Sequence, residues 1–222
     1  MKRTFYTLIL LAILLQSCLD SPYGKDHIGW RYVIGTVEKS GKVSSITTED
    51  PYKVIILNVD FPDSIIGQRV YAEGDMYNNN GGFDYGLKMA GYTVVSVKEA
   101  QIVENQGAIN LVNNASVSLD NNRIWQTGKY LNMHLTYYAT DLKKHSFDFL
   151  INGQTEKFEN NSVTINICHY NDGDTAAEKG YQTIFSLDLT NLFEEFTDDF
   201  DIKFVYIENS QKKEVIIKIS RF

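Results

Sequence analysis

The sequence predicts an all-β protein in which a small barrel is followed by a β-sandwich. Nearly every run that could form regular structure is rich in β-branched and aromatic residues, often alternating with polar ones, which is typical of strands. Turn signals built from Asn, Asp and Gly separate these runs. The polar connection Ala100–Asn113 divides them, so we expect a first domain at residues 28–100 and a second at residues 108–222.

The chain begins with the pattern of a bacterial lipoprotein signal. Lys2 and Arg3 precede an apolar run, Phe5–Leu15, and two polar residues then lead to Cys18. The run is too short for a membrane span, which needs about 20 residues. We therefore expect residues 1–17 to be a signal peptide; an apolar N-terminal helix is the alternative.

Processing of this signal makes Cys18 the first mature residue and the site of lipidation. Residues 18–27 then form a tether, and the lipid anchors the protein to a membrane of the cell envelope; we expect the outer membrane. Cys168 is left as the one free thiol, which allows no intrachain disulfide. Its apolar neighbours Val163–Ile167 predict a buried core position.

The first domain has the pattern of a Greek-key barrel. Its predicted strands are Trp30–Val37, Tyr52–Val59, Gln68–Gly74, Tyr85–Met89 and Tyr92–Val97. The last two are separated at Ala90-Gly91, where we expect a bulge or bend in one long returning strand. Five strands with such a return are typical of an OB-type barrel. A simple meander sheet is the alternative.

The second domain has the pattern of a β-sandwich. Its predicted strands are Ser116–Leu119, Arg123–Gln126, Lys129–Tyr138, His145–Ile151, Ser162–His169, Gln182–Asp188, Asp201–Glu208 and Lys213–Ile219. Asn152-Gly153 predicts a tight hairpin turn of the primed type. Thr190–Phe200 is the exception, since its apolar residues share one helical face and Thr190 is a candidate N-cap.

The charge balance disfavours nucleic acid as a partner. The formal net charge is -7, and removing Lys2 and Arg3 with the signal subtracts two positive charges to give -9. Nucleic-acid binding normally needs a basic stripe or patch, and none is visible in the sequence.

No motif for catalysis or a cofactor is present, so we expect no enzyme activity, no cofactor and no metal site. His27, His134, His145 and His169 are scattered, and each is expected to be a structural or surface residue. The segment Asn171–Asp174 gathers oxygens that calcium could use, but its spacing favours a hairpin loop.

Aromatic residues of the first domain offer a candidate binding surface. They are Trp30, Tyr32, Tyr71, Tyr77 and Tyr85. OB barrels bind oligosaccharides and oligonucleotides on one face, and the acidic charge favours a glycan or peptide here. Ordinary strand packing is the alternative, because Tyr and Trp are common in strands.

The layout resembles the NigD-like lipoproteins of the Bacteroidetes. The segments that carry the resemblance are Ser17–Asp20, Tyr32–Val37, Gly67–Tyr71, Asn113, Asn122–Trp125, Gly128–Met133 and Phe185–Leu189. The resemblance implies an N-terminal OB domain, a C-terminal sandwich and an envelope lipoprotein. The family name implies a bacteriocin-immunity role, and no active-site residues can be transferred.

Two tripeptides fit the acceptor pattern of envelope O-glycosylation in this phylum. Ser64 lies in Asp63-Ser64-Ile65, and Thr175 lies in Asp174-Thr175-Ala176. Taken together, the sequence predicts a non-catalytic envelope lipoprotein that binds an envelope partner, a glycan or a peptide. The alternative is a self-protection lipoprotein of the bacteriocin-immunity type.

Overall fold

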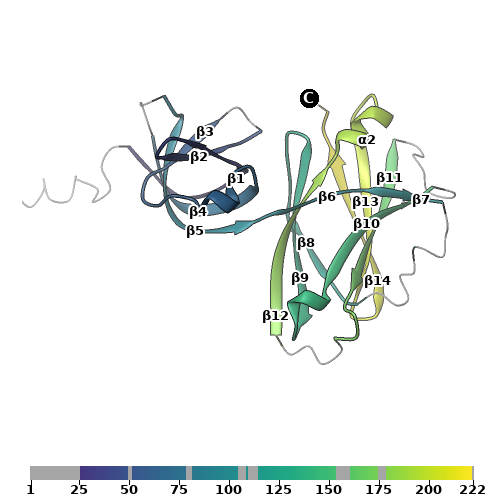
Figure 1. Cartoon of the computed structure of the whole chain (residues 1–222). Helices are drawn as coiled ribbons and strands as arrows, with labels where there is room; N and C mark the ends of the chain where they lie inside the picture. The colour runs from purple at the N-terminus through teal and green to yellow at the C-terminus, as the bar shows by residue number, and fades with distance from the viewer. Residues whose placement is uncertain are drawn as a thin grey trace, which may run out of the picture. The chain divides into compact units, whose positions relative to one another are not determined.

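The computed structural model describes residues 26–49, 52–78, 82–104, 109, 115–153, 161–174 and 179–221. The chain forms two compact units, both built of strands (Figure 1). The barrel unit takes the chain up to Gly67 and Ala72–Tyr92, and the sandwich unit takes Gln68–Tyr71 and Thr93–Phe222. The predicted lipidation site Cys18 lies outside the described residues.

The first sheet is a closed five-stranded barrel with the order β1-β2-β3-β5-β4. Its strands are β1 (His27–Ser40), β2 (Val43–Thr47), β3 (Lys53–Ile56), β4 (Arg69–Asn78) and β5 (Tyr85–Val94), with a short 3-10 turn, η1 (Asp63–Ile65), before β4. The neighbours β3 and β5 run parallel, which a meander does not allow. The predicted OB-like barrel is therefore confirmed.

The barrel includes one strand that the sequence pattern did not indicate. β2 is a short Ser- and Thr-containing strand that pairs with β1 across a turn at Gly41, whose φ is +61°. Ile46 of β2, Val54 of β3 and Leu87 of β5 are all buried. The predicted break at Ala90-Gly91 lies inside β5, which is continuous from Tyr85 to Val94.

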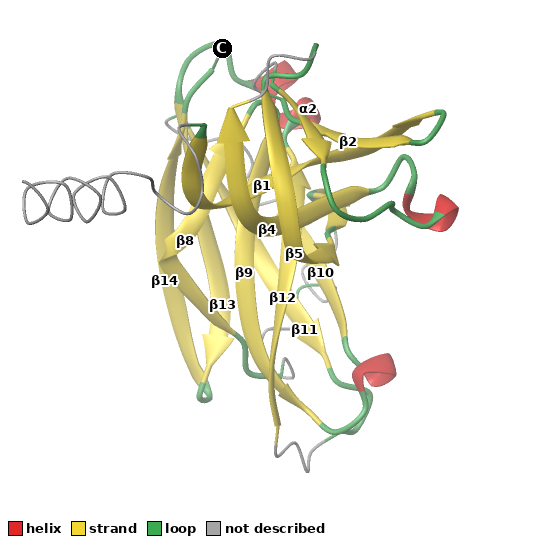
Figure 2. Ribbon diagram, turned by 90° about the vertical axis from the view of Figure 1, so that its left-hand side faces the viewer, coloured by secondary structure: helices red, strands yellow, loops and turns green. Residues whose placement is uncertain are grey.

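The second unit is a sandwich of two sheets (Figure 2). One sheet has the order β14-β13-β11-β10-β7 and the other β6-β12-β9-β8. The strands are β6 (Ser96–Glu99), β7 (Gln101–Val103), β8 (Ser118–Thr127), β9 (Tyr130–Ala139), β10 (Ser146–Asn152), β11 (Ser162–Tyr170), β12 (Lys179–Asp188), β13 (Phe200–Glu208) and β14 (Gln211–Ile219). The short helical elements are η4 (Leu142–Lys144) and α2 (Thr190–Glu195).

The sandwich begins before residue 108, where the sequence pattern placed its start. β6 pairs in parallel with β12, and β7 pairs in parallel with β10, so the chain leaving β5 gives an edge strand to each sheet. Both strands are short and largely exposed. An exposed edge strand carries little apolar periodicity, and for that reason the sequence pattern places β7 in the polar connection Ala100–Asn113. β6 overlaps the last two residues of the predicted strand Tyr92–Val97, which the sequence pattern assigns to the first domain.

The sandwich core comes from alternate residues on the facing sheets. On β9 the inward side chains Leu131, Met133 and Leu135 are fully buried. Phe149, Ile165 and Phe204 face them from the other sheet. Cys168 is also buried, as predicted.

Two local expectations were wrong. Asn152-Gly153 does not close a two-residue hairpin, because β11 begins only at Ser162 and the Gly153 N–H donates to the Val103 carbonyl at 3.0 Å. The tight turn forms instead at Asn209-Ser210, with φ of +50° and +63°. α2 begins at Thr190 and ends at Glu195, so Thr190 is the first helical residue and Leu189 is the N-cap. The backbone N–H of Thr190 donates to the carboxylate of Asp188 at 2.9 Å.

Candidate functional site

A polar groove of about 490 Å³ lies in the sandwich unit beside β8. Its lining comes from the start of β8, from β9 and β12, and from the turn after β13. The charged members are Asp120, Arg123 and Glu208, and most of the others carry hydroxyl or amide groups. We take this groove as the candidate site because charged, hydroxyl and amide side chains converge in it.

An irregularity in β8 makes room for the groove. Leu119 pairs with Leu135, but the next paired residues are Ile124 and Met133, so four residues, 120–123, stand opposite His134 alone. The extra residues bulge away from the sheet. The bulge is braced locally, since Asp120 accepts the N–H of Asn122 at 2.9 Å and lies 3.8 Å from the guanidinium of Arg123.

His134 lies opposite the bulge and lines the groove. Its ring packs edge-on against Tyr71 at 5.7 Å and lies 5.5 Å from Trp125, measured between ring centroids. Burial lowers the pKa of His134, although a hydrogen bond from the ring to Gln182 opposes this, so the ring is neutral at pH 7. Its Nδ1 atom is buried without a hydrogen-bond partner in the described part of the chain.

The groove can make many hydrogen bonds to one ligand. Thr136, Gln182 and Asn209 supply neutral donors and acceptors, Asp120 and Glu208 accept, and Arg123 donates. Tyr138 adds an aromatic ring that is 61% exposed. Such a lining suits a polar ligand rich in hydroxyl or amide groups better than an apolar one.

A buried histidine pair lies behind one edge of the groove. His145 Nδ1 is 2.8 Å from His169 Nε2, and His169 Nδ1 is 3.0 Å from the carbonyl oxygen of Ser116, a lining residue. Tyr137, another lining residue, packs against both rings at 5.2 and 5.1 Å. Phe147 stacks on His169 at 4.4 Å. The pair is thus enclosed by the core on one side and connected to the groove on the other.

Asp174 completes this cluster. Its carboxylate Oδ2 is 3.1 Å from His145 Nε2 and accepts the backbone N–H groups of Thr140 and Asp141 at 2.7 and 2.9 Å. These hydrogen bonds hold the pKa of Asp174 well below its usual range. The side chains of His145 and Asp174 are 1% and 7% exposed, so this is a buried ion pair when His145 is protonated.

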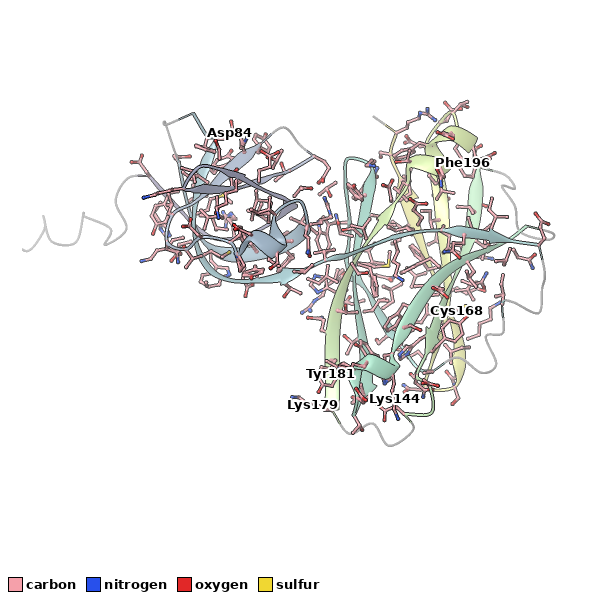
Figure 3. All side chains as sticks on the ribbon, in the orientation of Figure 1. Asp84, Lys144, Cys168, Lys179, Tyr181 and Phe196 are labelled. Carbon is pink, nitrogen blue, oxygen red and sulfur yellow. The ribbon has the colours of Figure 1, made fainter. Side chains whose placement is uncertain are left out.

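The sequence pattern did not bring these three residues together. Two histidines far apart in the chain meet because β10 and β11 pair antiparallel with Phe147 opposite His169, and the chain after β11 turns back to place Asp174 beside His145. The pairing register of β10 and β11 is the feature that could have predicted this cluster. Figure 3 shows Lys144 and Tyr181 at the end of the sandwich unit where this cluster lies, away from Phe196.

Within the described residues, no three or more His, Cys, Asp or Glu side chains are arranged to bind a metal ion. The carboxylate of Asp174, which the sequence offered as a calcium oxygen, is taken up by the backbone of Thr140 and Asp141 and by His145.

The five aromatic residues predicted to stack on a ligand have different surroundings. Trp30 and Tyr32 are 56% and 57% exposed at alternate positions of β1. Tyr77 packs against His27 at 5.1 Å and Tyr85 against Tyr52 at 5.6 Å. Tyr71 contacts the rings of Trp125 and His134. Their role in ligand stacking stays a prediction.

The two predicted glycosylation positions fare differently. Ser64 lies in η1 and is exposed, so a transferase could reach it. Thr175 lies outside the described residues. Modification of either residue stays a prediction.

Comparison with known proteins points to one family. The family described as NigD-like C-terminal beta sandwich domain matches residues 101–219, more than half of the chain. No curated protein sequence matches.

Solved structures share the fold over 86% of this chain. A protein of unknown function from Bacteroides vulgatus has a TM-score of 0.68 at 17% identity, with 92% of that chain covered. A NigD-like immunity protein from Bacteroides caccae has a TM-score of 0.60 at 15% identity, with 96% covered. A candidate lipoprotein from Bacteroides fragilis has a TM-score of 0.65 at 12% identity, with 97% covered. At these identities the likeness concerns the fold alone.

Proposed function

This chain belongs to the NigD-like family, and from that premise we propose that it is a non-catalytic binding protein of the cell envelope whose ligand site is the polar groove of the sandwich. The observation that carries the proposal is the lining of the groove. Carboxylates, a guanidinium, hydroxyls and amides converge there beside the exposed ring of Tyr138. This combination can bind the hydroxyl groups of a glycan and stack on its ring faces.

The anchor would place this groove at a membrane. Lipidation at Cys18 supplies the attachment, and among the described residues no helix has the length and apolar character needed to cross a bilayer. One structural relative is itself named as a candidate lipoprotein, which supports the same address. We expect the partner to be an envelope component, a glycan before a peptide, and not nucleic acid.

Photo-crosslinking from inside the groove tests the proposal. A photoreactive amino acid replaces Thr136, which lines the groove, and the protein is expressed in its own cells. The matched control places it at Ile216, a 64% exposed position on β14. We expect a specific adduct from position 136 that is lost with Tyr138→Ala or Asp120→Asn. Equal labelling from both positions would refute the groove as the ligand site.

Immunity is the second candidate function. One structural relative from Bacteroides caccae is named as an immunity protein, and another from Parabacteroides distasonis as toxin-related. In this case the groove would hold a secreted peptide. Cells lacking the protein would then become sensitive to a peptide made by their own population, and an adduct of that peptide, instead of a glycan, would form at position 136.

A further inference from the structure

The chain of contacts behind the groove has acceptors at both ends. At one end, the Ser116 carbonyl oxygen can only accept a hydrogen bond. At the other, the Asp174 carboxylate already accepts two backbone N–H groups, which keeps it ionised and makes it an acceptor for His145 as well. Each of the three contacts along the chain therefore needs one proton on a ring nitrogen.

Counting these protons fixes the charge of the pair. Two neutral imidazoles carry two N–H protons between them, and an imidazolium carries two on its own. The contacts Asp174–His145, His145–His169 and His169–Ser116 are all hydrogen bonds only when the two rings hold three protons. When all three hydrogen bonds are formed, the two rings together carry one positive charge, opposite the negative charge of Asp174.

Among the described residues, few other charged groups lie near the pair. Tyr137 of β9 packs against both rings and in turn contacts Tyr181 of β12, and burial keeps Tyr137 neutral by raising its pKa. Asp141, Lys143 and Lys144 lie in the exposed turn before β10, and Glu208 ends β13 near Ser116. Water and salt screen those exposed groups. Within the described part of the chain, Asp174 is therefore the buried counter-charge of the pair.

The groove edge depends on this chain. Ser116 lines the groove, and its hydroxyl accepts the backbone N–H of Asn209, a second lining residue, at 3.0 Å. The N–H of Ala115, next in sequence, donates to the carbonyl of His169 at 2.8 Å. The backbone at 115–116 is thus attached to His169 by two hydrogen bonds, and Asn209 is attached to Ser116 in turn.

We propose that the third proton on the His145–His169 pair controls the groove, holding the edge at Ser116 and Asn209 in its binding conformation. This inference rests on the groove being the ligand site proposed above. When the third proton leaves, two lone pairs face each other at one of the three contacts, and the series of hydrogen bonds from Asp174 to Ser116 loses one bond. The groove edge at Ser116 and Asn209 is then held less firmly. Ligand affinity then falls as the pH rises.

Histidine ring ¹⁵N NMR of the wild-type mature protein tests the proton count directly. We expect a range of pH in which three of the four ring nitrogens of the pair are protonated, with the third proton lost as the pH rises above that range. The amide signals of Ala115, Ser116 and Asn209 should move with the same midpoint. Two protons on the pair throughout the titration, or amides that follow a different midpoint, would overturn the proposal.

A variant pair separates charge from structure. Asp174→Asn keeps an oxygen for the backbone N–H groups but removes the counter-charge, so the third proton should leave at a lower pH than in the wild type. The matched control is Asp75→Asn in the barrel, where Asp75 lies 3.1 Å from His27 Nε2. It should leave the amides of Ser116 and Asn209 unchanged; movement of those amides in this control would count against the proposal.

The two proposals fail separately. If the crosslink at Thr136 gives no specific adduct, the proposed ligand site is wrong, and with it the regulatory meaning of the proton. If the crosslink succeeds but the adduct yield is the same below and above the midpoint of the pair, the groove binds its ligand and the proton link is wrong.

Discussion

At the scale of single residues, the burial of His169 makes this fold sensitive to acid. Burial lowers the pKa of His169 to about 4, with a smaller contribution from the neighbouring His145, whereas an unfolded histidine titrates near 6.5. Below pH 6.5 the unfolded chain therefore binds a proton that the folded chain refuses. The contribution of His169 to the free energy of unfolding therefore falls as the pH falls from 6.5 to 4, and it is fully present above 6.5.

The size of this effect can be measured by urea unfolding. A gap between about 4 and 6.5 corresponds to about 3 kcal/mol lost between pH 7 and pH 4. His169→Gln can still donate to Ser116 and accept from His145 but does not titrate, so its pH slope over this range should be smaller than that of the wild type. Equal slopes in the wild type and the variant would contradict the assignment.

At the scale of elements, the barrel depends on close approaches between strands, of which Gly74 provides one. A Cβ atom at Gly74 of β4 would collide with the carbonyl oxygen of Lys88 on β5, whereas one at Gly91 of β5 would meet nothing within 4 Å. We therefore expect Gly74→Ala to destabilise the barrel by about 1–3 kcal/mol through overpacking. Gly91→Ala should stay within about 0.5 kcal/mol of the wild type. Thermal unfolding of the two variants decides, and an equal loss in both would contradict the steric argument.

Elements were predictable where their side chains alternate over a buried face. Lys129–Tyr138 and Ser162–His169 lie within one or two residues of β9 and β11 for that reason. The sequence predicted neither β2 nor β7, and it predicted only the first two residues of β6, because short or exposed strands carry little of this pattern. The groove escaped for a different reason, since the bulge at residues 120–123 is visible only in the register between β8 and β9.

At the scale of the whole molecule, each of the two units has its own candidate ligand site. The family match lies in residues 101–219, and the groove with its histidine pair lies inside that range. The barrel has its own exposed aromatic residues, Trp30 and Tyr32, and these remain candidates for ligand stacking. Because both units belong to one chain, a shared anchor would hold both sites at the same membrane.

The two cysteines should behave differently, because we expect Cys18 to carry the lipid and Cys168 is buried in the sandwich. Intact mass of the native protein from membranes should correspond to a chain that begins at Cys18 and carries acyl groups there. Cys18→Ala should prevent acylation at this position. The variant should then either remain as the uncleaved precursor or, if the signal peptide is still cleaved, leave the membrane fraction. Cys168→Ala, at the buried thiol of β11, should leave both the acyl mass and the membrane location unchanged. A wild-type protein that lacks acyl mass, or a Cys18→Ala variant with the wild-type mass shift, would exclude lipidation at this residue.

Additional mass in the wild type that Ser64→Ala removes would identify the exposed serine of η1 as a glycosylation site.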